Sequence, residues 1–158
     1  MNRQGAENNM KRAVIYGAGN IGRGFIGQLF AQSGYKVTFI EVNAAVVAQL
    51  NQDHAYPINI VSEEGNEEIM IHQVDAVDGF NQDAVASAIS TADIMATAVG
   101  VPILPRIAPN IARGLQKRWQ SGNFTPLNLI ICENLIDADQ HLKKLVLAEL
   151  GEDHRKTL

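Results

Sequence analysis

The chain has 158 residues, of which 46% are hydrophobic and 19% are charged, a composition that predicts one packed domain and argues against disorder. Its formal net charge of -4 disfavours a protein that binds nucleic-acid phosphates, and no apolar run approaches the roughly 20 residues that span a bilayer. The single cysteine, Cys132, cannot form an internal disulfide, so we expect a cytoplasmic protein without nucleic-acid or membrane partners.

The two ends of the chain differ in composition from its middle. Residues 1–9 are polar and predict a disordered leader or tag, whereas residues 151–158 predict a charged tail. The tail follows the last predicted helix without a closing strand, which suggests that the chain is part of a longer protein. We therefore expect one folded domain over residues 10–150.

Short apolar runs alternate with segments of helical periodicity between these ends. The predicted strands cover residues 13–16, 37–41, 56–61, 69–74, 94–99 and 127–132, of which the third and fourth form an antiparallel hairpin. The predicted helices cover residues 21–33, 43–52, 83–91, 102–120 and 139–150. Apolar residues at helical spacing in the first helix are Ile21, Phe25, Ile26, Leu29 and Phe30. This alternation predicts an α/β fold of the Rossmann type, a doubly wound, mostly parallel sheet in the order 3-2-1-4-5 with helices on both faces.

A glycine-rich segment with the sequence Gly-Ala-Gly-Asn-Ile-Gly joins the first predicted strand to the first helix. Gly17 permits a tight turn, Gly19 lets a pyrophosphate approach the backbone, and Gly22 lets the helix pack close to the sheet. The helix N-terminus offers unpaired N–H groups and the positive end of its dipole. The motif predicts an NAD(P)-binding loop; a tight turn without a ligand is the alternative. The expected cofactor contacts are Gly17, Ala18, Gly19, Asn20, Ile21, Gly22 and Gly24.

An acidic residue, Glu41, ends the second predicted strand about 20 residues after this loop. A carboxylate there can accept hydrogen bonds from the adenosine ribose and would repel a 2′-phosphate. No Arg or Lys follows immediately to bind such a phosphate. Glu41 therefore favours NAD over NADP, unless it is only a solvated acid at a strand end.

Further candidates follow from the rule that ligands bind beyond the carboxyl ends of parallel strands. Arg23, beside the loop, is expected to contact cofactor phosphate or a substrate anion, or to be a solvated helix arginine. The turn carrying Thr97, Val99 and Gly100 is expected near the nicotinamide ribose. Asn134 could bind a substrate oxygen or the nicotinamide side, or could act as a helix cap.

Neither a metal site nor a catalytic base is predicted. The four histidines lack the spacing of metal ligands. Lys143 and Lys144 lie on a predicted amphipathic helix rather than at a strand end, so we assign neither to catalysis.

The extended run Gly17–Gly27 resembles the mannitol-1-phosphate 5-dehydrogenases, which belong to the long-chain polyol dehydrogenase family. The likeness covers residues 10 to about 150. The other matching segments are Thr38-Phe39 before Glu41-Val42-Asn43, Thr97–Gly100, Arg106–Pro109, and Pro126–Asn128 leading to Cys132-Glu133-Asn134.

This resemblance implies an oxidoreductase of class EC 1.1.1 that converts mannitol 1-phosphate and NAD to fructose 6-phosphate and NADH. It implies that the glycine loop binds NAD, that Glu41 binds the ribose, and that Asn134 helps to polarise the substrate oxygen. Family members are more than twice as long and carry their catalytic lysine, with an asparagine and a histidine, in a helical C-terminal domain. We therefore expect this chain to bind NAD without efficient catalysis and to contain no catalytic base.

Three alternatives remain open. The chain could be a stand-alone NAD-sensing regulatory module, or it could belong to another polyol or hexuronate dehydrogenase of the same family. A methyltransferase that binds S-adenosylmethionine shares the glycine turn and the strand-end acid, but the tight glycine spacing favours a dinucleotide.

Overall fold

The fold is built on a five-stranded parallel sheet. The structure is a computed structural model that describes residues 10–62 and 65–151, so the predictions for residues 1–9 and for most of the tail lie outside the described residues. The sheet has the order β5-β2-β1-β6-β7. Its strands are β1 (Arg12–Tyr16), β2 (Lys36–Glu41), β5 (Val74–Asp78), β6 (Ile94–Thr97) and β7 (Asn128–Ile131). Counted along the chain, the parallel strands are ordered 3-2-1-4-5, which confirms the predicted topology.

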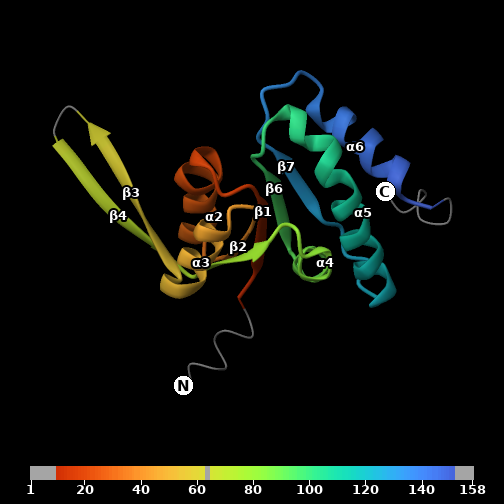
Figure 1. Cartoon of the computed structure of the whole chain (residues 1–158), viewed down its shortest axis with the longest axis horizontal. Helices are drawn as coiled ribbons and strands as arrows, with labels where there is room; N and C mark the ends of the chain where they lie inside the picture. The colour runs from red at the N-terminus through yellow and green to blue at the C-terminus, as the bar shows by residue number, and fades with distance from the viewer. Residues whose placement is uncertain (1–9, 63–64, 152–158) are drawn as a thin grey trace.

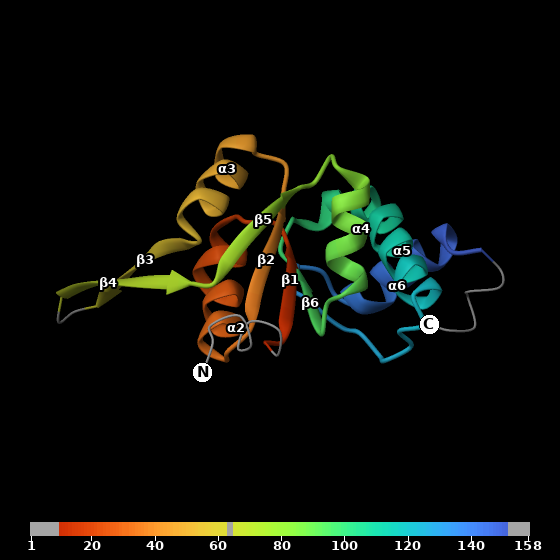
Figure 2. The same ribbon diagram turned by 90° about the horizontal axis from the view of Figure 1, so that it is seen from below.

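Helices cover both faces of this sheet, as predicted (Figure 1, Figure 2). On one face lie η1 (Gly22–Gly27), α2 (Gln28–Gln32) and α3 (Ala44–Asp53), and on the other lie α4 (Gln82–Ser90), α5 (Leu104–Gln120) and α6 (Ala138–Glu149), with η2 (Val101–Ile103) leading into α5. Each face has its own buried cluster, one around Phe39 and Leu50 and the other around Met95 and Leu104. None of the helices in the described part of the chain is long and apolar enough to cross a membrane.

The predicted hairpin is present, but its second strand begins and ends earlier than the predicted range of residues 69–74. The hairpin consists of β3 (Ala55–Ser62) and β4 (Gly65–His72), which pair antiparallel and project from the body of the domain (Figure 1). Gln73 has a φ of 62°, a left-handed conformation that ends β4. Val74 then begins β5, so one predicted strand is in fact the end of the hairpin and the start of the third parallel strand.

The first helix differs from the prediction in form and in the face that it buries. It begins as the π-helix η1 and continues as α2. Ile26 and Phe30 are buried, whereas Ile21, Phe25 and Leu29 are 53%, 55% and 45% exposed. The helix thus has two apolar stripes, of which only the one formed by Ile26 and Phe30 packs against the sheet. The close approach at Gly27, where a Cβ would lie 2.7 Å from the Phe39 ring, selects the stripe of Ile26 and Phe30.

Helices α4 and α5 pack through a glycine contact. Gly114 of α5 is buried against Ile89 of α4, and a Cβ at Gly114 would lie 2.5 Å from the Ile89 side chain. Such a distance is far below van der Waals contact, so the two helices can approach this closely only because residue 114 has no side chain.

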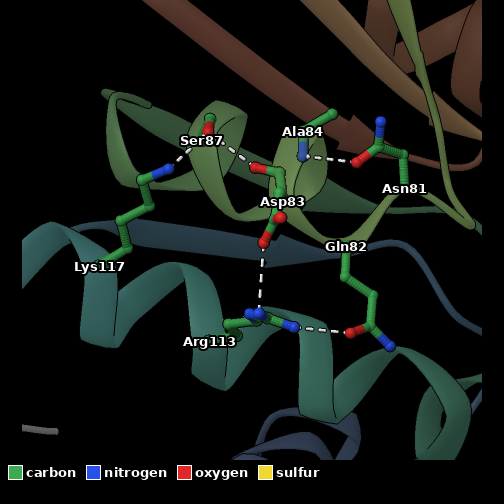
Figure 3. Close-up of polar contacts among 7 residues, drawn as sticks. All are labelled: Asn81, Gln82, Asp83, Ala84, Ser87, Arg113 and Lys117. Carbon is green, nitrogen blue, oxygen red and sulfur yellow. Dashed lines mark hydrogen bonds and ion pairs between the residues drawn. The ribbon is translucent and has the colours of Figure 1, made fainter.

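Polar side chains line the solvent edge of the same helix pair (Figure 3). Arg113 lies 3.2 Å from the Asp83 carboxylate and donates to Gln82 at 2.6 Å, and Lys117 donates to the Ser87 hydroxyl at 2.7 Å. Asn81 caps α4 by accepting from the Ala84 N–H. The Arg113–Asp83 pair is exposed, so it contributes less to stability than the buried contact beneath it.

We predict that Gly114→Ala lowers the free energy of unfolding by about 1–3 kcal/mol, because the added methyl group overlaps Ile89. Gly24→Ala is the matched control, since no heavy atom lies within 4 Å of a Cβ at Gly24. The control should be neutral or stabilising by up to about 1 kcal/mol through helix propensity. Urea denaturation of both variants measures the difference, and equal stability of the two would contradict the packing described.

Candidate functional site

The glycine loop leaves β1 at the carboxyl edge of the sheet and turns directly into the first helix. Gly17 has a φ of 101°, and a Cβ there would lie 2.4 Å from the Ala98 carbonyl oxygen. A Cβ at Gly22 would lie 2.0 Å from the Gly17 oxygen. Gly19, in contrast, is exposed and has no heavy atom within 4 Å of the position of a Cβ. The fold itself thus requires two of the glycines, whereas the third keeps the outer surface of the loop clear.

The N-terminus of the first helix lies beside this clear surface. The Gly17 N–H donates to Ile40 and the Arg23 N–H donates to Gly19, each at 2.9 Å, so the helical turn begins immediately after Gly19. The first N–H groups of a helix have no acceptor within the helix. They are therefore available to an anion above the loop, in line with the positive end of the helix dipole.

Glu41, at the end of β2, holds the loop from the side. Its Oε2 accepts a hydrogen bond from the Ala18 N–H at 2.9 Å, and its Oε1 accepts from the N–H groups of Val42 and Asn43 at 2.8 and 2.9 Å. A carboxylate has about four acceptor positions, so three are used and one remains for a ligand hydroxyl. Glu41 is thus a structural link between β2 and the loop as well as a candidate ribose ligand.

The turn after β6 packs against the glycine loop and is anchored by a residue to which the sequence analysis gave no role. Glu133 accepts from the Val99 N–H at 2.9 Å and from the Gly100 N–H at 2.8 Å. Thr97 is fully buried, and its hydroxyl has no hydrogen-bond partner within residues 10–62 and 65–151. The side chain of Thr97 therefore lies beneath the surface of the site rather than on it.

The segment after β7 carries the remaining candidate. Asn134 is exposed and follows Glu133 directly. Neighbouring Cys132 donates its N–H to the Thr97 carbonyl at 2.9 Å, which extends the pairing of β6 and β7. Burial and then the nearby Glu133 carboxylate raise the pKa of the Cys132 thiol, so the thiol is disfavoured as a nucleophile.

Arg23 lies at the junction between the loop helix and the hairpin. The Tyr56 hydroxyl donates to the Arg23 carbonyl at 2.7 Å. The Arg23 Nε is buried and has no partner in the part of the chain that the structure describes. The hairpin is therefore attached to the π-helical turn by this hydrogen bond. π-Helical turns are frequent at functional sites.

The structure gathers most of the predicted positions at one edge of the sheet. Direct contacts join the glycine loop to Glu41 and to the 97–100 turn, and Glu133 joins that turn to the segment bearing Asn134. The sequence pattern did not predict the roles of Glu133 and Tyr56. The available signal for Glu133 was a second acidic residue near the carboxyl end of a strand, comparable to Glu41 at the end of β2.

Comparison with known proteins agrees with this geometry. Residues 11–158 match the family model of the mannitol dehydrogenase Rossmann domain. The chain belongs to this family.

Two curated relatives are similar over nearly all of the chain. The mannitol-1-phosphate 5-dehydrogenase of Lactiplantibacillus plantarum is 45% identical over 143 residues, and that of Lactococcus lactis subsp. lactis is 43% identical over 147 residues. These matches cover 90% and 92% of this chain but only 37% and 38% of the relatives. The chain thus spans less than two fifths of their length.

Solved structures of lower identity share the fold. A UDP-glucose dehydrogenase from Pyrobaculum islandicum matches with a TM-score of 0.62 at 15% identity, covering 91% of this chain and 34% of that one. A glycerol-3-phosphate dehydrogenase from Coxiella burnetii matches with a TM-score of 0.52 at 15% identity, covering 90% and 38%. These similarities support the Rossmann architecture.

We predict that Tyr56→Phe lowers the free energy of unfolding by about 1 kcal/mol at pH 7, because the Arg23 carbonyl loses its donor. Tyr35→Phe is the control, since no hydrogen bond of its hydroxyl is found among the described residues. Burial raises the pKa of Tyr56 above 10.0, with Arg23 opposing the shift in part. Above about pH 10 the unfolded phenol therefore ionises before the folded one, and the wild type loses stability. Denaturation at several pH values should show that the difference in the free energy of unfolding between wild type and Tyr56→Phe becomes smaller above pH 10. A difference that does not change with pH would contradict the burial of this phenol.

Proposed function

We propose that residues 10–150 form the NAD(H)-binding domain of a cytoplasmic polyol-phosphate dehydrogenase. The observation that carries this proposal is the cradle at Gly19, where a required turn leaves open space above backbone N–H groups. Close backbone contacts require glycine at positions 17 and 22, but no contact within the fold requires glycine at position 19. The approach of a diphosphate to the backbone would explain why residue 19 has no side chain.

In this proposal, different residues around the glycine loop bind different parts of the cofactor. The pyrophosphate lies against the loop from Gly17 to Gly24, with Arg23 beside it. Glu41 accepts from the adenosine ribose through its remaining acceptor position and excludes a 2′-phosphate. Thr97, Val99 and Gly100 form the support for the other half of the dinucleotide, and Asn134 faces the reacting end.

The proposed reaction is oxidation of mannitol 1-phosphate to fructose 6-phosphate, as the names of the relatives suggest. NAD supplies the hydride acceptor. The alcohol must also lose a proton to a base. The proposed site includes the amide of Asn134, which can polarise an oxygen but cannot act as that base. We propose that the base belongs to the portion of the relatives that this chain does not span, so that the chain alone binds cofactor without efficient turnover.

Exposed apolar side chains support a second domain over this edge of the sheet. Ile21, Phe25, Val42, Phe80 and Ile136 are all exposed and lie in the segments that follow β1, β2, β5 and β7, with Phe25 inside η1. A group of apolar residues around a polar site is typical of a surface that another protein surface covers. We propose that the further domain of the full-length enzyme covers it and encloses the polyol phosphate.

Calorimetric titration of the chain with NADH, NADPH and S-adenosylmethionine tests the proposal. We expect binding of NADH, at least about tenfold weaker binding of NADPH because of Glu41, and none of S-adenosylmethionine. Tighter binding of NADPH would contradict the role of Glu41, and binding of S-adenosylmethionine alone would favour the methyltransferase alternative. An NADH-forming assay with mannitol 1-phosphate should show negligible turnover, and robust turnover would refute the assignment of the base to another domain.

Filling the cradle gives a second test. Gly19→Ala should weaken NADH binding by about tenfold, because its methyl group enters the space above the loop. The free energy of unfolding should change by less than about 0.5 kcal/mol, since the substitution meets no neighbour. Gly151→Ala, also without neighbours, is the control and should change neither quantity. Unchanged NADH affinity in Gly19→Ala would remove the main support for the proposed site.

A further inference from the structure

Glu41 and Glu133 lie on opposite sides of the glycine loop, the first on β2 beside β1 and the second after β7, one strand beyond β6. Glu41 is the last residue of β2 and Glu133 lies two residues beyond β7, and each accepts at least one hydrogen bond from a backbone N–H of the turn after the neighbouring strand. Glu41 binds the Ala18 N–H in the turn after β1. Glu133 binds the Val99 and Gly100 N–H groups in the turn after β6. The arrangement places one carboxylate under each half of the carboxyl edge of the sheet.

The Glu133 carboxylate continues the contact between β6 and β7 past the point where their backbone pairing ends. The last backbone bond joins the Cys132 N–H to the Thr97 carbonyl at 2.9 Å. Beyond it, the chain after β6 turns at Gly100, whose φ of 88° is left-handed. Both oxygens of Glu133 are used to hold this turn, so the carboxylate fixes the orientation of two successive peptide groups.

The position of this turn bears directly on the phosphate loop. The Ala98 carbonyl lies so close to Gly17 that a Cβ there would be 2.4 Å away. Glu133 also directly precedes Asn134, and its own carbonyl accepts from the Leu135 N–H at 2.9 Å. One carboxylate therefore fixes the 99–100 turn, which flanks the loop, and the segment that presents Asn134.

The direction of the cofactor follows from the two ends of the site. The pyrophosphate belongs at the loop after β1, and the adenosine ribose at Glu41 on β2. The other half of a dinucleotide must then extend in the opposite direction, over β6 and β7. Resting on the proposed function, we infer that Glu133 is a positioning residue for the nicotinamide-riboside half of the cofactor, acting through the Val99–Gly100 turn.

The test compares two ligands that differ only in that half. NADH contains the whole dinucleotide, whereas ADP contains only its adenosine and two phosphates. In the 158-residue chain, Glu133→Gln retains the size of the side chain but replaces one acceptor oxygen with a donor that faces a backbone N–H. We expect NADH affinity to fall by about tenfold and ADP affinity to change less than about twofold. Glu41→Gln should instead weaken both ligands.

Glu68→Gln, which makes the same chemical change on the exposed hairpin, is the matched control and should bind both ligands normally. Glu133→Asp, which retains the charge, should recover part of the NADH affinity and serves if Glu133→Gln does not fold. Hydrogen exchange of the Val99 and Gly100 amides should accelerate in Glu133→Gln. Equal loss of NADH and ADP binding, or no loss of either, would overturn the role of Glu133. Failure of the wild-type chain to bind either ligand would instead reject the proposed function.

Discussion

The contact between Gly17 and the Ala98 carbonyl sets the geometry on which the candidate site depends. A side chain at residue 17 would overlap that carbonyl, and the φ of 101° independently favours glycine there. The contact joins the turn after β1 to the turn after β6 at the carboxyl edge of the sheet. The phosphate loop and the neighbouring turn therefore keep a fixed relative position before any ligand arrives, which lowers the entropy lost on binding.

Two carboxylates extend this constraint to either side. Glu41 fixes the loop to β2, and Glu133 fixes the 99–100 turn to the segment after β7. Each uses hydrogen bonds from backbone N–H groups to a charged acceptor, which are stronger than neutral ones. The shape of a site held in this way depends largely on backbone groups and on these two carboxylates.

The exposed apolar side chains near the site contribute differently from the two carboxylates, because they make few contacts within the described part of the chain. The glycine loop is a feature expected of the mannitol dehydrogenase Rossmann domain family, whereas the exposed apolar side chains are the basis of our proposal that a further domain covers this edge. The buried clusters on the two faces of the sheet give this part its own core. The glycine loop and the exposed apolar residues thus lie at the same edge of the sheet, where we propose that the substrate is enclosed.

The sequence by itself determined the alternation of strands and helices and the glycine loop between the first strand and helix, because these depend on local periodicity and on residues close together in the chain. The strand order was predicted from the general topology of such alternating folds, and it is formed by strands that are distant in the chain. The sequence also placed Glu41 correctly at a strand end. The tertiary structure alone decided that Ile26 rather than Phe25 faces the sheet, because that choice depends on the contact of Gly27 with Phe39 and Tyr56. It likewise decided the partners of Glu133, which lie more than thirty residues away in the chain. Local pattern shows which residues can form a contact, and only the packing of distant segments determines which contacts form.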